Sequence, residues 1–254
     1  MRLSLYYNPL IIIERLAISI NRYKRKNKLK NTPAAKLNQG HLDSLELLEL
    51  IKADGCAIKT IFDVGANIGT WTLLAKSFFP DAEVHAFEPL NKHIQQFETN
   101  TKKLQNVELY SYCLGNENTF STINISSFSD SSSIMNATPL EFQQFGIKKI
   151  KEEQIEIKRL DDLIDNKVLP VPDIIKLDVQ GFELEVLKGI RKYINHINYL
   201  IVEVSFKEYY YDQPLFLDIA NYLSGNKFNI YALGHSTPIG KELGQLDVLF
   251  KKQL

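Results

Sequence analysis

Three acidic side chains at the ends of short apolar segments are the groups in this sequence best placed for chemistry. Asp63 lies in one apolar run, Glu88 directly follows a second, and Asp178 lies near the end of a third. Charged groups are rarely left in such segments without a partner or a function. Ligands of open α/β sheets bind at the carboxyl ends of the strands. The three acids therefore predict a ligand site at one edge of a parallel sheet.

A glycine-punctuated turn precedes the second acid. Gly65 and Gly69 bracket the turn between a strand at residues 60–64 and a helix expected from Trp71 to Phe79. Glycine lets the backbone turn tightly and approach a ligand closely, and the start of the helix offers unpaired amides. Glu88 follows Gly69 by 19 residues, close to the spacing between a dinucleotide-binding turn and the acid that binds ribose. We therefore expect a nucleoside site in a β-α-β unit.

The acidic pair Asp63 and Glu88 indicates which nucleoside binds there. The G-x-G-x-x-G pattern of pyrophosphate sites is absent, so an acidic pair suits a cationic, phosphate-free ligand. S-adenosylmethionine is favoured over NAD on this ground. Two other classes stay open, an NAD(P)-dependent Rossmann oxidoreductase and a non-catalytic nucleoside-binding module. The glycines also have a purely structural interpretation, close packing of helix on strand.

Three sequence blocks carry a resemblance to a known family. Residues 63–69 (DVGANIG), 87–89 (FEP) and 175–183 (IKLDVQGFE) resemble, in the same order, the signature blocks of the FkbM family of methyltransferases. The resemblance extends from about Thr60 to the C-terminus. It implies an S-adenosylmethionine-dependent methyltransferase that O-methylates a hydroxyl of a sugar, a glycan or a natural product. The residues expected at the cofactor are Asp63, Gly65, Asn67, Gly69, Glu88, Pro89, Cys113, Leu114 and Asp178.

An attacking hydroxyl needs a base, and several side chains are candidates. Asp178 is the first choice, and Glu203 ends the neighbouring strand on the same edge. Two carboxylates so placed can share a proton, or they can hold a divalent cation. The metal-free interpretation is preferred, and no metal site is predicted. Glu183 and His235 are further candidates, His235 in an expected loop at residues 234–240.

The alternation of strand and helix patterns predicts a Rossmann-like α/β fold. It is the seven-stranded class I methyltransferase sheet, with helices on both faces and an antiparallel last strand. Residues 56–254 are expected to form the methyltransferase domain. Within it, the serine-rich stretch and its alternating flanks, residues 116–157, predict a β insertion that acts as a lid. Residues 1–55 are expected to form an N-terminal helical extension.

Composition excludes some classes of partner. The 254 residues contain 30 basic and 30 acidic side chains, which gives no overall attraction to nucleic acid. Two cysteines, Cys56 and Cys113, make neither a disulfide framework nor a metal site and are typical of a reducing cytoplasm. No signal peptide and no membrane-spanning segment are expected.

The first 30 residues differ from the rest in charge, with eight basic residues and one acidic residue. Apolar residues recur at helical spacing before the basic cluster, at Leu10, Ile13, Leu16, Ala17 and Ile20. Such a helix packs on the domain or on a partner subunit in a homo-oligomer, or lies peripherally on an anionic membrane surface, here the inner one. Packing is the preferred interpretation.

Overall fold

The computed structural model of the chain describes residues 9–127, 131–239 and 241–253. Parts of two predicted segments, residues 1–8 of the basic segment and residues 128–130 of the insertion, lie outside the described residues, as does residue 240 of the expected loop.

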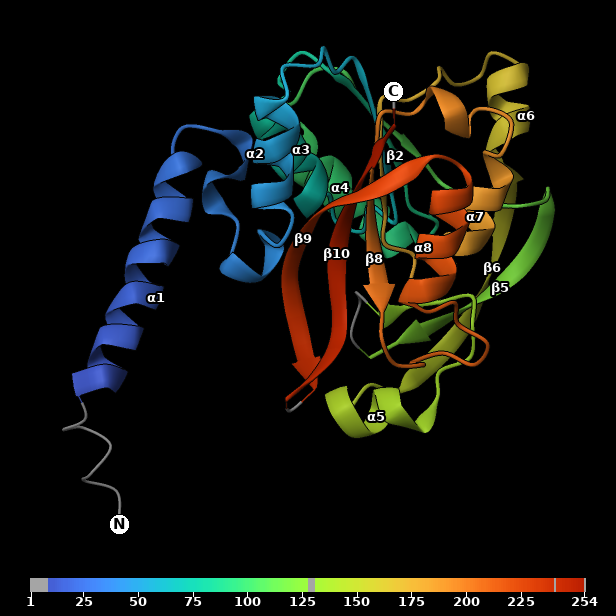
Figure 1. Cartoon of the computed structure of the whole chain (residues 1–254). Coiled ribbons are helices and arrows are strands. Elements are labelled where there is room, and N and C mark those ends of the chain that lie inside the picture. The colour runs from blue at the N-terminus through green and yellow to red at the C-terminus, as the bar shows by residue number, and fades with distance from the viewer. Residues whose placement is uncertain (1–8, 128–130, 240, 254) are drawn as a thin grey trace.

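One sheet of seven strands is the centre of the fold, in the order β3-β2-β1-β7-β8-β10-β9 (Figure 1). The first five of these strands run parallel, and β10 runs antiparallel to both of its neighbours. The predicted α/β class and the predicted seven-stranded sheet are therefore confirmed. The strands are β1 (Thr60–Val64), β2 (Glu83–Phe87), β3 (Val107–Tyr110), β7 (Ile174–Leu177), β8 (Tyr199–Ser205), β9 (Phe228–Ile239) and β10 (Glu242–Lys252).

Helices cover both faces of this sheet because successive strand residues point to opposite sides. Ile61 packs with α2 (Leu45–Ala53) and α3 (Thr70–Phe78), whereas Phe62 packs on the opposite face. That second face is covered by α6 (Leu160–Asp165), α7 (Glu183–Gly189) and α8 (Phe216–Gly225). Helix α4 (Asn91–Thr101) lies beside α3, and its Phe97 packs on Ala66 and Ala86.

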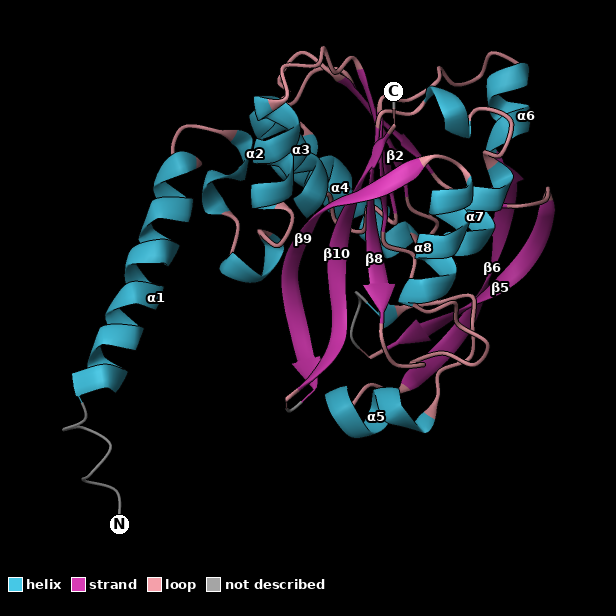
Figure 2. Cartoon of the chain, in the orientation of Figure 1, coloured by secondary structure: helices cyan, strands magenta, loops and turns pink. Residues whose placement is uncertain are grey.

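The predicted insertion, residues 116–157, supplies β5 and most of β6 in a second, smaller sheet (Figure 2), whose strand order is β4-β6-β5. This sheet consists of β4 (Cys113–Gly115), β5 (Thr119–Ser126) and β6 (Lys149–Arg159), and a short helix, α5 (Pro139–Phe145), interrupts it. The sequence analysis did not anticipate α5. The two β segments expected on either side of the serine-rich stretch are present.

The expected loop at residues 234–240 is wrong. Strand β9 continues through His235 to Ile239 and pairs with β10 in a long hairpin. Gly234 and Pro238 were taken as loop signals, but β9 is an edge strand, where proline needs no partner for a missing amide. The pairing of β9 with β10 also shifts register at three places.

Four helical segments precede the sheet: α1 (Pro9–Lys28), the two 3-10 turns η2 (Pro33–Lys36) and η3 (Gln39–His41), and α2. Leu45, Leu48 and Ile51 of α2 are fully buried against β1, α3 and β10. The core of the sheet therefore includes part of the expected extension, and the domain boundary at residue 55 stays a prediction. Within the described residues, no helix is long and apolar enough to cross a membrane.

Candidate active site

A cavity of about 490 Å³ lies at the carboxyl edge of the parallel strands. Its wall contains the turn after β1, the end of β2, the start of β4, the ends of β7 and β8, and parts of β9, β10 and the insertion. The volume lies within the range of small-molecule sites. Of the predicted site residues, Gly65, Asn67, Glu88, Pro89, Cys113, Leu114, Asp178, Glu203 and His235 line it.

Glu88 is buried at one end of the cavity, where it organises the turn after β1. One carboxylate oxygen accepts a hydrogen bond from the Asn67 amide at 3.0 Å. The other accepts from the Leu90 amide at 3.0 Å and lies 3.1 Å from His93 Nδ1. A carboxylate has about four acceptor positions, so this one retains capacity for a ligand hydroxyl. The sequence predicted Glu88 as a ligand acid, but its support of the turn was not foreseen.

Gly65 lies where two strand ends approach closely. Its φ is +78°, and a Cβ built on it would lie 1.9 Å from the backbone oxygen of Asp178. Glycine is thus required by the end of β7 and by the backbone conformation as well as by the cavity. The sequence analysis explained this glycine by the close approach of a ligand. The close contact with the end of β7 requires it as well.

Two predicted cofactor residues lie behind the cavity wall. Among the described residues that line the cavity, neither Asp63 nor Gly69 is present. Asp63 is fully buried, accepts a hydrogen bond from the Thr72 hydroxyl at 2.6 Å, and lies 3.8 Å from Lys176 Nζ. A Cβ at Gly69 would meet the Phe97 ring at 2.9 Å, so Gly69 permits α4 to pack. Their direct contact with a cofactor stays a prediction that this geometry does not favour.

The apolar wall of the cavity comes from β4 and the insertion. Leu114 is buried, Cys113 is half-buried, and burial raises the pKa of the Cys113 thiol well above its usual range. Ile123 and Ile134 of the insertion and Phe182 complete this wall. A flat, uncharged base fits such a surface, and the contact of Cys113 and Leu114 with the cofactor stays a prediction.

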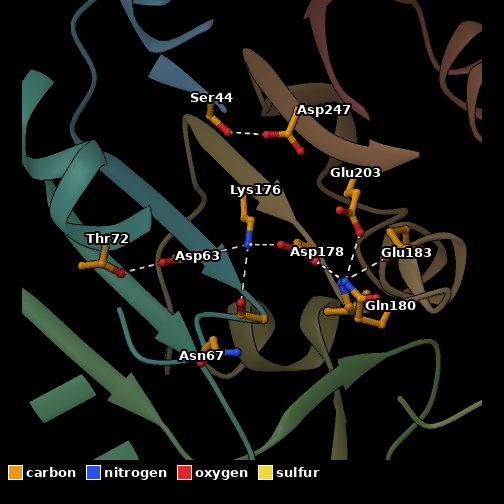
Figure 3. A network of polar contacts seen from close by, with 12 residues as sticks. Ser44, Asp63, Asn67, Thr72, Lys176, Asp178, Gln180, Glu183, Glu203 and Asp247 are labelled. Atoms are coloured by element: carbon orange, nitrogen blue, oxygen red, sulfur yellow. Dashed lines mark hydrogen bonds and ion pairs between the residues drawn. The ribbon is translucent and has the colours of Figure 1, made fainter. Parts of the chain in front are cut away.

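Lys176 joins the turn after β1 to the catalytic candidates (Figure 3). Its ammonium lies 3.1 Å from Asp178 Oδ2 and 3.4 Å from the carbonyl oxygen of Gly65. Burial alone would lower the pKa of Lys176, but the carboxylates of Asp178 and Asp63 reverse the effect and raise it. Lys176 therefore forms an ion pair that fixes one oxygen of Asp178.

Gln180 links the two carboxyl groups that the sequence analysis named first (Figure 3). Its Nε2 lies 2.8 Å from Asp178 Oδ1 and 3.1 Å from Glu203 Oε2. Burial, with the charges of Asp178 and Asp247, raises the pKa of Glu203 well above its usual value. The carboxyl pair predicted from strand position is thus adjacent, and the Gln180 amide bridges it.

The sequence analysis missed Gln180 and Asp247. Asp247 lines the cavity, accepts a hydrogen bond from Ser44 Oγ at 2.5 Å, and burial raises its pKa to about 6. It is an acid in the apolar strand β10, so the reasoning applied to Asp178 would have found it. Gln180 was treated only as part of a turn. Its backbone φ of +54° is unusual for a residue with a side chain and marks a constrained position.

The two remaining base candidates have different surroundings. Glu183 accepts hydrogen bonds from the Val179 and Gly181 amides at 3.0 and 3.2 Å, so it supports the turn. Burial raises its pKa to about 7. His235 is half-exposed at the cavity rim, and its Nε2 lies 3.6 Å from Glu46. Within the described part of the chain, no group of three or more His, Cys, Asp or Glu is arranged to hold a metal ion.

Comparison with known proteins identifies the family. Residues 63–230 match the family described as the methyltransferase FkbM domain. The chain belongs to the FkbM methyltransferase family. This FkbM domain contains the turn after β1, the acid at the end of β2 and the Asp178 segment, so the three blocks that carried the resemblance all lie in the match.

Curated relatives share more than a quarter of their aligned residues with the FkbM protein. It is 28% identical over 163 residues to the hexuronic acid methyltransferase AglP of Haloferax volcanii, covering 63% of this chain and 61% of that protein. It is 28% identical over 143 residues to methyltransferase 1 of Beauveria bassiana, covering 51% of this chain and 57% of the relative. The matched part thus spans about three fifths of these relatives.

Among solved structures, magnesium protoporphyrin IX methyltransferase ChlM from Synechocystis PCC 6803, crystallised with bound SAM, aligns with a TM-score of 0.48 at 14% identity. The alignment covers 84% of this chain and 80% of that one.

Membership in the FkbM family implies S-adenosylmethionine as the cofactor, and the cavity fits it. Glu88 offers a carboxylate for ribose hydroxyls, and Leu114 with its apolar neighbours offers a surface for adenine. The carboxyl groups of Asp178, Glu203 and Asp247 at the other end suit a ligand with a positively charged sulfur.

Proposed function

We propose that this FkbM protein is an S-adenosylmethionine-dependent O-methyltransferase whose acceptor is a hydroxyl of a sugar, a glycan or a natural product. The observation that carries the proposal is the position of Asp178. Its carboxylate lines the same cavity as Glu88, and both of its oxygens are held by neighbouring side chains. The relative described as a hexuronic acid methyltransferase supports a sugar acceptor.

The cofactor supplies a methyl group on a positively charged sulfur, which an oxygen nucleophile can attack. The protein orients the acceptor and removes the hydroxyl proton. Asp178 is the base in this proposal, because Lys176 and Gln180 fix its two oxygens while leaving lone pairs free. The proton of the acceptor hydroxyl passes to the Asp178 carboxylate as the oxygen acquires the methyl group.

Glu203 has a different role from Asp178 in this proposal. Two ionised carboxylates close together repel, and burial with the charge of Asp178 raises the pKa of Glu203 well above its usual value, which favours its neutral form. Glu203 is therefore a positioning residue, acting through the Gln180 amide. His235, paired with Glu46 at the rim, is the second choice for the base.

The insertion acts as a cover in the same proposal. Ile123, Ser133 and Ile134 line the cavity, and Ser133 Oγ donates a hydrogen bond to the backbone oxygen of Gln180 at 2.6 Å. The insertion thus contacts the segment that holds the carboxyl pair. Excluding water there would strengthen each electrostatic contact.

Two measurements test the proposed function. Calorimetric titration with S-adenosylhomocysteine and with NAD separates a methyltransferase from the oxidoreductase alternative. If neither compound binds, the cavity takes a different nucleoside or no nucleoside at all. Methyl transfer from labelled cofactor is then assayed against hexuronic acids, neutral sugars and lipid-linked glycans. Tight binding of NAD with no binding of S-adenosylhomocysteine would overturn the cofactor assignment. Transfer only to nitrogen or carbon acceptors would overturn the O-methylation.

A further inference from the structure

Helix α1 presents an exposed apolar face. Ile13, Leu16, Ile20 and Tyr23 follow one another at spacings of three, four and three residues, which places them on one side of the helix. Their side chains are 61%, 56%, 53% and 70% exposed, and Ile12 beside them is 48% exposed. Side chains of this kind gathered on one unpartnered face mark an interaction surface.

Basic residues lie on much of the remaining helix surface, together with the exposed Ile18. Arg15, Arg22 and Lys26 lie on the side away from Ile20, and Lys24 borders the apolar face. All four are exposed, and none forms an ion pair with another described residue. Glu14 is the single acidic residue of the helix. The helix is therefore amphipathic, with a polar face that is strongly positive.

The last turns of α1 are firmly attached to the domain. The Arg25 side chain is buried and pairs with Glu46 at 2.8 Å, and it donates further hydrogen bonds to the Leu42 carbonyl and to Gln39. Lys28 pairs with Glu49, and Leu29 is buried in the core. The preceding part of the helix projects away from the body of the molecule (Figure 1). The attachment thus presents the exposed face in a fixed orientation.

The chemistry of this face selects an anionic surface. Exposed isoleucines in a single projecting helix are not stabilised by water, so the apolar face needs a cover. In a second copy packed on the same face, the Lys24 side chains that border this face would lie near one another, which opposes self-association. A layer of anionic lipid offers an apolar boundary for the isoleucines and negative headgroups for the long basic side chains. The helix also lies outside the matched region, residues 63–230, so it is not part of the family match.

We propose that α1 binds this protein peripherally to a membrane surface rich in anionic lipid. The helix lies along the interface, with Ile13, Leu16 and Ile20 in the apolar boundary and the arginines and lysines among the headgroups. This goes beyond the proposed methyl transfer, since it concerns where the enzyme is held rather than what it modifies.

Co-sedimentation of the full chain with lipid vesicles tests the proposal. We expect binding to phosphatidylcholine vesicles that contain phosphatidylglycerol, little binding to pure phosphatidylcholine, and weaker binding as salt increases. The variant I13N/L16N/I20N removes the apolar face, and R15Q/R22Q/K26Q removes the charge. Each should weaken binding by about tenfold or more. The variant N21Q, on the side of the helix away from Leu16, is the matched control and should bind like the wild type.

Thermal unfolding and titration with S-adenosylhomocysteine check that every variant folds, independently of vesicle binding and of any acceptor. Absence of binding to both kinds of vesicle would overturn the proposal. So would equal binding by I13N/L16N/I20N and wild type. A dimer in light scattering that dissociates in I13N/L16N/I20N, without vesicle binding, would assign the face to a second copy of the chain.

Discussion

The side-chain nitrogen of Gln180 lies 3.1 Å from Glu203 Oε2, a contact that joins two neighbouring strand ends. The same nitrogen lies 2.8 Å from Asp178 Oδ1. The Tyr210 hydroxyl lies 3.2 Å from Gln180 Oε1 and donates to it, which fixes which end of the amide faces the carboxyls. One uncharged side chain therefore sets the geometry of both acids.

The substitution Asp178→Asn keeps the shape of the side chain and removes its charge. If the carboxylate accepts the hydroxyl proton, turnover should fall by about 100-fold or more, while affinity for S-adenosylhomocysteine changes little. Single-turnover methyl transfer and calorimetry measure the two quantities. Asp81→Asn, an exposed position, is the matched control. Full activity of Asp178→Asn would make His235 the next candidate.

The substitution Gln180→Met removes the bridge while keeping the length of the side chain. The bridge holds the Asp178 and Glu203 carboxyls in one geometry, so its loss should lower turnover while KM for the cofactor changes little. Steady-state titration with the cofactor measures both quantities. An equal loss of turnover and of cofactor affinity would indicate a merely structural role for Gln180.

The substitution Glu88→Ala should weaken cofactor binding by about 1.5–3 kcal/mol, the range for a lost hydrogen bond to a charged group. Because Glu88 also supports the turn through the Asn67 amide, thermal unfolding must be measured beside the titration. Glu83→Ala, an exposed acid at the start of the same strand, is the control. Unchanged affinity in a folded Glu88→Ala protein would remove Glu88 from the cofactor site.

The buried Glu183 predicts a pH dependence of stability. Burial raises its pKa from 4.5 to about 7 in the folded protein, so the folded state binds the proton more tightly. Its contribution is fully present below about pH 4.5 and is lost as pH rises through about 7. Relative to the wild type, Glu183→Gln should therefore gain roughly 3 kcal/mol in unfolding free energy between these limits. Denaturant unfolding at several pH values measures it, and a constant difference would contradict the prediction.

The substitution Gly65→Ala should destabilise the protein by at least about 2 kcal/mol, because its Cβ would overlap the Asp178 carbonyl and because φ is positive. Gly225 at the end of α8 has no heavy atom within 4 Å of its added Cβ. Gly225→Ala should therefore change stability by about 1 kcal/mol at most. Thermal unfolding compares the two. Equal effects would show that the contact at Gly65 is not decisive.

Strand positions in the parallel half of the fold were predictable because their side chains are apolar over short, bounded runs. The runs around Asp63 and before Glu88 coincide with β1 and β2, and each acid is where strand order implied. Which way a side chain points was less predictable. Asp63 lies in β1, a strand that is buried on both faces. Its carboxylate therefore contacts Thr72 and Lys176 behind the cavity wall and does not line the cavity.

The antiparallel half of the fold and the bridge were less accessible from sequence. Pro238 and Gly234 look like loop residues until β9 is known to be an edge strand, a property of the sheet rather than of the local sequence. Gln180 bridges the two acids only because β7 pairs with β8, which brings Asp178 and Glu203 together. Long-range pairing decides such contacts, so one segment read alone does not reveal them.

The position of Lys176 has a consequence for engineering. One ammonium group contacts Asp63 and the Gly65 carbonyl at the turn after β1 and Asp178 at the end of β7. One lysine side chain therefore holds both the turn after β1 and the Asp178 carboxylate in place. A redesign for a new acceptor can change the residues that the insertion contributes to the cavity wall. Any change that moves Lys176 would instead disturb the turn after β1 and the Asp178 carboxylate together.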